Sequence, residues 1–441
     1  MGRAQPIHDE RGAEPEARAL APLIAALDVG ISKTTCLAAR RDPVLDMHPD
    51  RPMRVLGVGV QSAPAMAAGK AADFDACARA IRVAIEEAQF MAGAPIARVT
   101  ASYSGPGLKA AVARATVRVR GNLIADRDLS AALAAAARAA IGPDMTVLHV
   151  EPLRYVIDED EPTLDPVGAP GKRLTAEACV VTAPEAALAD LRACIRQAGI
   201  EVEEIVAGPL AAGVSVLAEE ERNAGALMLD FGAGALGIAV FAEEGLVHAE
   251  TLPMGGVRLT RELAKRLDTT FAAAERVKLT YGVVGSNFDP RDAVPAPRLG
   301  PDGRLEQAAT LRGVLAETLA PRFHEMLTAA RYRLIKAGFA GATGPHRAVL
   351  VGGGAQLPGA REMAAEILGM PVRIGRPFDL SGFDHAEAGP GFAVAAGLLR
   401  WRFDRPGLDD VEASFAPSLA EAAQAMRDAA GRALHWLRDN F

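Results

Sequence analysis

Short apolar runs alternate with amphipathic stretches along most of the chain, which is the pattern of an α/β protein. Residues 23–29 (LIAALDV) form a nearly continuous apolar run, as expected for a strand buried on both faces. After a glycine-containing turn, residues 34–40 and 53–60 continue as two further strands, and apolar positions recur at helical spacing over 74–91. The first part of the chain therefore predicts a three-stranded meander followed by a helix.

The same arrangement returns about 200 residues later. Residues 226–231 (ALMLDF) form a second apolar run with an aspartate near its end, and two further strands joined by a Glu-Glu-Gly turn follow within 237–252. The triplet Asp28-Val29-Gly30 and the triplet Asp230-Phe231-Gly232 thus occupy equivalent places. Because each opens a meander, the chain is predicted to contain a duplicated α/β domain with a cleft between its halves.

The region between the two repeats, residues 104–178, has a pattern of its own. It combines short strands with an alanine-rich helix and a proline-containing loop, so we interpret it as an inserted small α+β subdomain. Its strands are expected at 112–120, 146–151 and 154–159, and its helix near 128–141. Beyond the insertion the pattern predicts six helices, two that begin at Pro184 and Pro358 and four over 257–267, 271–281, 311–337 and 390–401. It also predicts a buried strand over 348–354. A proline-rich stretch over 285–303 is poorly patterned.

Composition narrows the class of protein. The 441 residues are 50% hydrophobic and 23% charged, which excludes global disorder, and the net charge of −7 argues against wholesale nucleic-acid binding. Cys36, Cys77, Cys179 and Cys194 show no metal-ligand spacing and are expected to be reduced and buried. No signal peptide and no apolar run of about 18 residues is evident, so we expect a soluble or peripheral protein.

Glycine-rich loops follow three of the predicted strands. Residues 232–237 (GAGALG) match the dinucleotide-binding fingerprint, but strand-like residues follow where that fingerprint needs a helix, so a Rossmann oxidoreductase is disfavoured. The alternative is a phosphate clamp, in which backbone N–H groups of two facing hairpins approach phosphate oxygens. Asp28 and Asp230 would then hold a hydrated Mg²⁺, and the turn 352–354 would receive the nucleoside. Each loop alone is compatible with a simple tight turn, whereas all three in this order favour a nucleotide cleft.

The order of these loops resembles a known superfamily. Residues 28–33 (DVGISK), 230–234 (DFGAG) and 351–359 (VGGGAQLPG) are similar to the phosphate and nucleoside loops of the actin, sugar-kinase and chaperone ATPase superfamily. Within it the chain most resembles the FtsA family, the bacterial cell-division actin homologues. Further resembling segments are 148–174, 252–264, 273–282, 314–327, 371–377 and 391–401. The resemblance implies two RNase H-like (actin-like) domains around an ATP cleft, with the inserted subdomain in place of one peripheral subdomain of actin.

The resemblance also implies the roles of individual residues. Ser32 and Lys33 would lie in the first phosphate loop, and the carboxylates of Asp28 and Asp230 would face Mg²⁺ through bound water. Glu275 and Lys278, one helical turn apart, would frame the ribose and adenine, although an exposed ion pair is the alternative for them. The full nucleotide site implied in this way comprises Asp28, Gly30, Ser32, Lys33, Asp230, Gly232, Gly234, Gly255, Gly256, Glu275, Lys278, Gly352, Gly353 and Gly354.

The second phosphate loop departs from the superfamily pattern. That loop usually continues with a hydroxyl residue and then an aspartate, but this chain has Ala235 and Gly237 there. Losing a hydroxyl donor and a carboxylate could each remove about 1.5–3 kcal/mol of charge-assisted bonding. No general base stands in for them, so we name no catalytic residue and expect ATP hydrolysis to be slow or absent.

The last residues, 418–441, form a predicted amphipathic helix after a linker at 404–417. The sequence pattern leaves two alternatives open, a helix docked on the protein or on a sister chain and a helix bound to a membrane. The ending Trp436-Leu437-Arg438 with Phe441 resembles the membrane-targeting tail of FtsA, which favours the membrane. The side chains expected to contact lipid are Leu419, Met426, Leu434, Trp436, Leu437 and Phe441.

The resemblance therefore implies a cell-division protein that tethers polymers of the tubulin-like FtsZ to the cytoplasmic face of the inner membrane. Its implied partners are the FtsZ C-terminal peptide, later divisome proteins, membrane lipids and copies of itself, and no nucleic acid. The FtsZ contact would lie within 257–322, where Arg304 and Arg312 are candidate cationic contacts. The alternatives are a pilus-assembly actin-like protein and a small-molecule kinase on the same scaffold.

These interpretations divide the chain into segments. Domain 1 comprises 21–103, 179–215 and 389–403, and domain 2 has its core at 216–256 and 323–388 and a peripheral subdomain at 257–322. The insertion occupies 104–178, a disordered leader 1–20, the linker 404–417 and the amphipathic helix 418–441.

Overall fold

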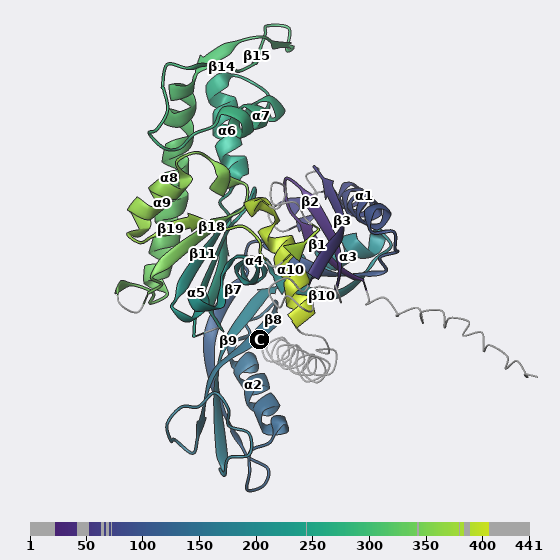
Figure 1. Cartoon of the computed structure of the whole chain (residues 1–441), viewed down its shortest axis with the longest axis vertical. Helices are drawn as coiled ribbons and strands as arrows, with labels where there is room; N and C mark the ends of the chain where they lie inside the picture. Colours follow the sequence, from purple (N-terminus) through teal and green to yellow (C-terminus); the bar gives the residue numbers. More distant parts are fainter. Residues whose placement is uncertain are drawn as a thin grey trace, which may run out of the picture.

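The computed structural model describes residues 23–41, 53–62, 66–67, 70–71, 73–243, 245–341, 344–378, 380–382 and 389–404. The predicted leader, all of the predicted linker except Asp404, and the predicted C-terminal helix lie outside these residues. The described part of the chain is elongated, and two large sheets lie side by side near its middle (Figure 1).

The first sheet has six strands in the order β10-β6-β1-β2-β3-β20. Its centre is the predicted meander, in which each strand is antiparallel to the next, and β6 and β10 continue the sheet in parallel. Helices α1 and α3 pack together beside the strands, while α10 packs on β1 and on α4, which lies between the two sheets (Figure 1). The elements are β1 (Ile24–Val29), β2 (Thr34–Arg41), β3 (Met53–Gln61), α1 (Phe74–Ala92), β6 (Arg98–Tyr103), α3 (Glu185–Gln197), β10 (Glu201–Ala207), α4 (Gly208–Val216), β20 (Leu380–Ser381), η4 (Pro390–Phe392) and α10 (Ala393–Asp404), with a small hairpin of β4 (Met66–Ala67) and β5 (Lys70–Ala71).

The second sheet repeats this arrangement. Its strand order β18-β11-β12-β13 matches β6-β1-β2-β3, with a parallel neighbour on one side and an antiparallel meander on the other. The predicted duplication of the α/β unit is therefore confirmed. The elements are β11 (Ala226–Phe231), β12 (Leu236–Ala242), β13 (Gly245–Leu252), β18 (Arg347–Val351), η3 (Gly354–Gln356), α9 (Ala360–Leu368) and β19 (Val372–Ile374).

The insertion is built from three strands and a helix, as predicted, and it forms the lower end of the molecule in Figure 1. Its strands extend the second sheet, because β7 joins β13 through the pair Lys109 and Glu250. The two separate strands expected at 146–151 and 154–159 are one strand, whose register shifts at Pro152 because proline cannot donate to the ladder. Strand β9 also continues past the predicted boundary at 178. The elements are β7 (Lys109–Arg118), α2 (Asp126–Ala140), β8 (Met145–Ile157) and β9 (Arg173–Pro184).

The peripheral subdomain of the second half forms the upper end of the molecule (Figure 1). Helices α6 and α7 agree with the predicted ranges within a residue, and Thr270 caps α7 by accepting from the amide of Ala273. The stretch 285–303, expected to be unpatterned, contributes two short strands of small hairpins. The elements are α6 (Gly256–Leu267), α7 (Phe271–Tyr281), β14 (Ala293–Pro295), β15 (Arg298–Leu299), β16 (Leu305–Glu306), β17 (Ala309–Leu311) and α8 (Arg312–Lys336).

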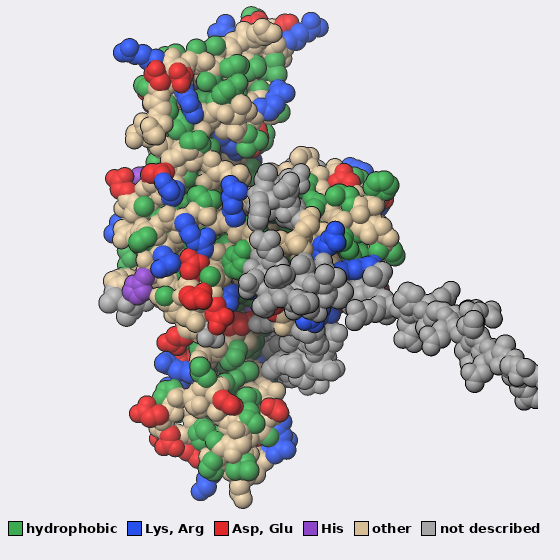
Figure 2. Space-filling view, viewed as in Figure 1, with side chains coloured by type: hydrophobic (Ala, Val, Ile, Leu, Met, Phe, Trp, Pro, Cys, Tyr) green, Lys and Arg blue, Asp and Glu red, His purple; other side chains and the backbone are tan. Residues whose placement is uncertain are grey.

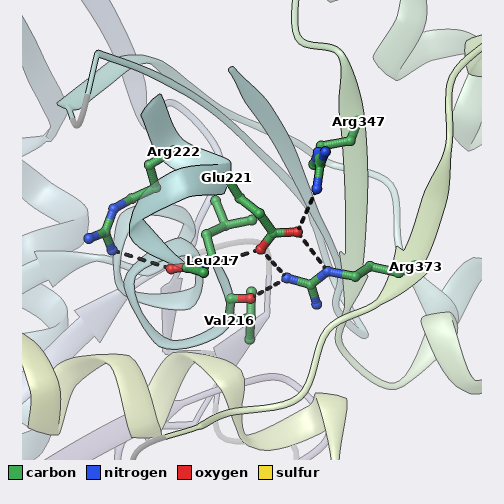
Figure 3. A network of polar contacts seen from close by, with 7 residues as sticks. Val216, Leu217, Glu221, Arg222, Arg347 and Arg373 are labelled. Carbon is green, nitrogen blue, oxygen red and sulfur yellow. Dashed lines mark hydrogen bonds and ion pairs between the residues drawn. The ribbon is translucent and has the colours of Figure 1, made fainter. Parts of the chain in front are cut away.

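The chain crosses between the halves through α4 and a short helix that the sequence pattern did not predict, α5 (Glu219–Asn223). Ser215 ties this crossing to the returning one, because its hydroxyl donates to the carbonyl of Ala393 at 2.7 Å and its carbonyl accepts from the amide of Phe378 at 3.2 Å. Just beyond it, Arg373 donates to Glu221 at 2.9 Å and to the carbonyl of Val216 at 2.6 Å (Figure 3). The α4–α5 corner is therefore fixed to the edge of the second sheet.

Candidate nucleotide cleft

A cleft of about 360 Å³ lies between the two halves, at the strand ends where the glycine-rich loops meet. Thirteen of the fourteen residues predicted to bind nucleotide line it: Asp28, Gly30, Ser32, Lys33, Asp230, Gly232, Gly234, Gly256, Glu275, Lys278, Gly352, Gly353 and Gly354. Gly255 is not among the lining residues, because it packs behind the second phosphate loop, where a Cβ would lie 2.4 Å from the carbonyl oxygen of Ala233. The structure therefore brings the sequence-predicted site together in one place.

The two phosphate loops contact each other across the cleft. A Cβ on Gly234 would lie 1.9 Å from Cδ1 of Ile31, so the second loop needs glycine where the first loop approaches it. The third loop is equally close to the second, because Gly352 has a φ of 82° and a Cβ there would lie 2.4 Å from Oδ1 of Asp230. Close approach of backbone leaves N–H groups accessible to an anion, which is how glycine-rich turns hold phosphate.

The carboxyl groups of Asp28 and Asp230 share the floor of the cleft. The hydroxyl of Ser102 donates to Oδ1 of Asp28 at 2.6 Å. Burial raises the pKa of Asp28, against the lowering effects of this hydrogen bond and of Lys33. Burial and the nearby charge of Asp28 raise the pKa of Asp230 to about 7. A bound cation would stabilise the ionised forms of these two neighbouring carboxyl groups and so counteract the rise in their pKa values.

Lys33 provides a positive charge close enough to interact with both carboxyl groups. Its Nζ donates to the carbonyl of Gly391 at 2.6 Å and lies 4.1 Å from the ring centroid of Phe392. Burial lowers the pKa of Lys33, while Asp28 and Asp230 act in the opposite direction. The side chain thus links the first phosphate loop to the turn that begins α10. Lys33 also lines the cleft, so its ammonium group is placed to contact a phosphate bound there.

Glu275 and Lys278 form the predicted pair one helical turn apart, with Nζ and Oε2 separated by 2.8 Å. Lys278 is only 7% exposed, which rules out the alternative of an exposed ion pair. Its ammonium group also donates to Oγ1 of Thr260 at 2.8 Å and to the carbonyl of Gly256 at 3.3 Å, and Thr260 in turn bonds Glu275. Since Gly256 donates to the carbonyl of Gly232, these bonds connect α7 and α6 to the second phosphate loop.

Several cleft residues were missed by sequence reasoning. They include Ser102 at the end of β6, Gln356 after the third glycine loop, Gly391 before α10, and the exposed Leu279 beside Lys278. Ser102 carries a signal that could have been used, because β6 runs parallel to β1 and parallel strands end at the same edge of a sheet. Gly391 had no local signal, since it acts through its carbonyl.

The second phosphate loop contributes no hydroxyl or carboxylate beyond Asp230. Ala235 and Gly237 both line the cleft, and a Cβ on Gly237 would lie 3.0 Å from Cγ of Pro209 and 3.3 Å from Cβ of Asp230. Across the described residues, no group of three or more His, Cys, Asp or Glu side chains could hold a metal ion. Mg²⁺ would fit here in the way it commonly binds, through phosphates, water and the carboxylates of Asp28 and Asp230.

The candidate FtsZ contacts lie in the peripheral subdomain, away from the cleft. Lys and Arg side chains project from its upper end, where β14 and β15 lie (Figure 2). The side chain of Arg304 is 88% exposed there, whereas that of Arg312 is 28% exposed, with Asp292 at 3.9 Å and the ring centroid of Phe288 at 5.8 Å. A polar groove of about 500 Å³ runs between α6 and α8; its lining residues are Glu262, Lys265, Arg266, Glu317, Thr318, Pro321 and Arg322.

Two further expectations can be compared with the structure. All four cysteines are buried and free, as the composition predicted. None of the helices within the described ranges combines the length and the apolarity that crossing a bilayer requires.

Comparison with known proteins agrees with the geometry. The family described as "Cell division protein FtsA" matches residues 227–397, and the one described as "SHS2 domain inserted in FTSA" matches residues 105–182, which is the insertion. The chain is similar to the cell division protein FtsA of Rhizobium meliloti, with 33% identity over 95% of each chain. It is also similar to that of Pseudomonas aeruginosa, with 30% identity over 95% of this chain and 98% of the relative.

Solved structures show the same fold at lower identity. One structure of a PilM–PilN type IV pilus biogenesis complex is similar with a TM-score of 0.61 and 19% identity over 86% of this chain and 98% of that one. MreB5 of Spiroplasma citri bound to ADP is similar with a TM-score of 0.50 and 14% identity over 88% of this chain and 98% of that one. The mixed α/β actin-like fold is thereby confirmed, and the sequence relatives over nearly the whole length decide the family. The chain belongs to the FtsA family of cell division proteins.

Proposed function

We propose that this protein binds ATP with Mg²⁺ in the cleft and tethers FtsZ polymers to the cytoplasmic face of the inner membrane at the division site. The observation that carries the proposal is the meeting of three glycine-rich loops around the paired carboxyl groups of Asp28 and Asp230 in a chain of the FtsA family. Later divisome proteins and further copies of the chain, assembled into a polymer, are its other proposed partners.

ATP acts in this proposal as a ligand that sets conformation and polymerisation, and its hydrolysis is slow or absent. Ala235 and Gly237 support this, because neither can orient a water or contact a metal. The same two positions argue against a small-molecule kinase. A phosphate-release assay on pure protein tests the point, and turnover above about one per second, within the ordinary enzyme range, contradicts it.

The membrane contact is assigned to residues 418–441, through Leu419, Met426, Leu434, Trp436, Leu437 and Phe441. The segment carries three Arg and three acidic residues, so apolar insertion would contribute more than attraction to anionic lipid. Co-sedimentation with liposomes compares the full chain with one that ends at Pro417. Equal pelleting of both would end the assignment.

The FtsZ C-terminal peptide is assigned to the peripheral subdomain, at the groove between α6 and α8. Lys265, Arg266 and Arg322 give the groove three cations against two acids, which suits a peptide with acidic side chains or a free carboxylate. Pro321 has no amide hydrogen, so the carbonyl of Glu317 lacks its usual helical donor and is available to a peptide N–H.

Fluorescence anisotropy with a labelled FtsZ C-terminal peptide tests this assignment. Arg322→Ala is expected to weaken binding about tenfold, the effect of losing one charge-assisted contact. Arg361→Ala, an exposed arginine paired with Glu362 on α9, is the matched control. Arg304→Ala tests the other candidate, and a loss confined to that variant would move the contact to the upper hairpins.

A further inference from the structure

Several strands of the first sheet begin or end at the edge that faces away from the cleft. Strand β2 ends at Arg41, opposite the first residue of β3, Met53, and Arg54 pairs with Arg40 in the same ladder. Strand β6 begins there at Arg98, beside Glu201 at the start of β10. The side chains of Arg41, Arg54 and Arg98 are all exposed, so this edge carries a row of arginines that the nucleotide site does not use.

Helix α1 ends at the same edge and exposes apolar side chains there. The helix packs closely on β3, since a Cβ on Gly57 would lie 2.0 Å from the carbonyl oxygen of Ala88. Its last turn carries Phe90, which is 90% exposed, and Met91, which is 59% exposed. None of the other large hydrophobic side chains in the described part of the chain is as exposed as Phe90. Phe90 and Met91 are adjacent and together form a small contiguous apolar patch, and covering this patch would gain the free energy of burying both side chains.

The acidic side chains at this edge are largely paired. Glu203 accepts from Arg402 at 2.7 Å, and Asp404 lies 3.5 Å from Arg400. Among the described residues at this edge, the other acids are Glu201 and the exposed Glu86, one turn before Phe90. In the described part of this edge, a phenylalanine and a methionine are thus flanked by three exposed arginines, Arg41, Arg54 and Arg98, against two exposed acids, a combination that matches an anionic lipid surface.

The position of α10 indicates which partner covers this edge. The helix ends at Asp404 close to β2, because the guanidinium carbon of Arg41 lies 5.3 Å from the ring centroid of Phe403. Residues 405–441 follow directly, and they include the segment to which the proposed function assigns lipid binding. A bilayer that holds this segment would be within reach of the edge where Phe90 and the arginines lie.

We propose that Phe90, Met91, Arg41, Arg54 and Arg98 form a second lipid contact, termed here the membrane rim, which binds anionic bilayers. This inference rests on the proposed function, since the C-terminal segment supplies the first contact. Two weak contacts on one chain act together through effective concentration, so the rim would also fix the orientation of the first half relative to the bilayer.

The test uses the full chain and vesicles of phosphatidylcholine with 30% phosphatidylglycerol, a composition chosen for the experiment. Replacing both apolar side chains (Phe90→Ser with Met91→Ser) is expected to lower vesicle partitioning about five- to tenfold, the effect of withdrawing partly inserted apolar surface. The control replaces two exposed apolar side chains of the insertion, Val112 (55% exposed) and Leu123 (56% exposed), by serine. Arg54→Ser is expected to lower partitioning about fivefold on these vesicles and not on pure phosphatidylcholine.

A chain that ends at Pro417 separates the rim from the tail. This shortened chain is expected to keep weak binding to the anionic vesicles, and the double serine variant is expected to abolish that binding. If truncation removes all binding and the rim variants match the control in the full chain, the rim is refuted and the tail assignment stands. If truncation has no effect while the rim variants weaken binding, the tail assignment fails and the rim stands.

A spectroscopic readout reports direct contact. Phe90→Cys can be labelled selectively with an environment-sensitive dye, because the four native cysteines are buried. A blue shift on anionic vesicles is expected, and the same dye at Val112→Cys should not shift. An unchanged spectrum at position 90 in a chain that is fully vesicle-bound overturns the proposal, as does a shift that appears without vesicles when the chain self-associates.

Discussion

The ammonium group of Lys33 donates to the carbonyl of Gly391 at 2.6 Å, which joins two segments separated by 358 positions in the sequence. The same turn is held by the third glycine loop, because the amide of Gly352 donates to the carbonyl of Pro390 at 3.0 Å. The first phosphate loop, the nucleoside loop and the start of α10 therefore meet at one point. A phosphate that attracts Lys33 competes with Gly391 for the same ammonium group.

Replacing Lys33 by methionine is expected to lower the affinity for Mg-ATP about 10- to 100-fold. The reason is the loss of a charge-assisted contact to phosphate, worth about 1.5–3 kcal/mol. Isothermal titration calorimetry measures the change. Lys172→Met, on the exposed surface of the insertion, should bind ATP like the parent chain. Equal affinities of the two variants would exclude Lys33 from the nucleotide site.

Gly352→Ala and Gly353→Ala are expected to differ sharply although they are neighbours. Gly352 has a φ of 82° and meets Asp230 and the backbone of Phe231, whereas a Cβ on Gly353 has nothing within 4 Å. The first substitution should cost about 1–3 kcal/mol in unfolding free energy from backbone strain and displace Asp230, which weakens Mg-ATP binding. Urea denaturation and ATP titration measure both effects. Comparable losses in the two variants would mean that the loop is not packed as described.

Asp230→Asn is expected to change how stability depends on pH in the ligand-free protein. A carboxyl group with a raised folded-state pKa stabilises the fold below its unfolded value of 3.8, and that contribution is lost as pH rises through about 7. The parent chain should therefore lose up to about 4 kcal/mol relative to the variant between pH 4 and 8. Mg-ATP should reverse the loss. Thermal unfolding across this pH range measures it, with the exposed Asp302→Asn as control; parallel curves for all three chains contradict the prediction.

Lys278→Met is expected to destabilise the protein by about 2–4 kcal/mol, because it removes one partner from a buried network with Glu275 and Thr260. Since the network connects the start of α6 to the second phosphate loop, ATP affinity should also fall. Lys265→Met is the matched control on the same subdomain, where the ammonium group is 77% exposed and 3.9 Å from Glu262. A variant that is destabilised but binds ATP normally would separate the structural role from the nucleotide site.

Much of this architecture was predictable from the sequence because the information is local. The apolar runs near whose ends Asp28 and Asp230 lie define the two central strands. The glycines after them indicate places where another segment or an anion approaches the backbone closely. What could not be predicted depends on contacts between distant segments. The α4 helix is apolar all round because it is buried between both halves, so it carries no helical stripe. Gly391 and Ser102 enter the cleft only once the two sheets are assembled.

Ser215 has a consequence for how the halves can move. Because Ser215 on the outgoing segment binds the returning segment twice, through its hydroxyl to Ala393 and through its carbonyl to Phe378, the two crossings cannot separate there without breaking both bonds. A rotation of one half against the other that keeps both bonds would turn about this crossing, so a small change in spacing at the phosphate loops would give a larger displacement at the far ends of the elongated molecule (Figure 1). The length of the molecule would therefore amplify a movement that begins in the cleft.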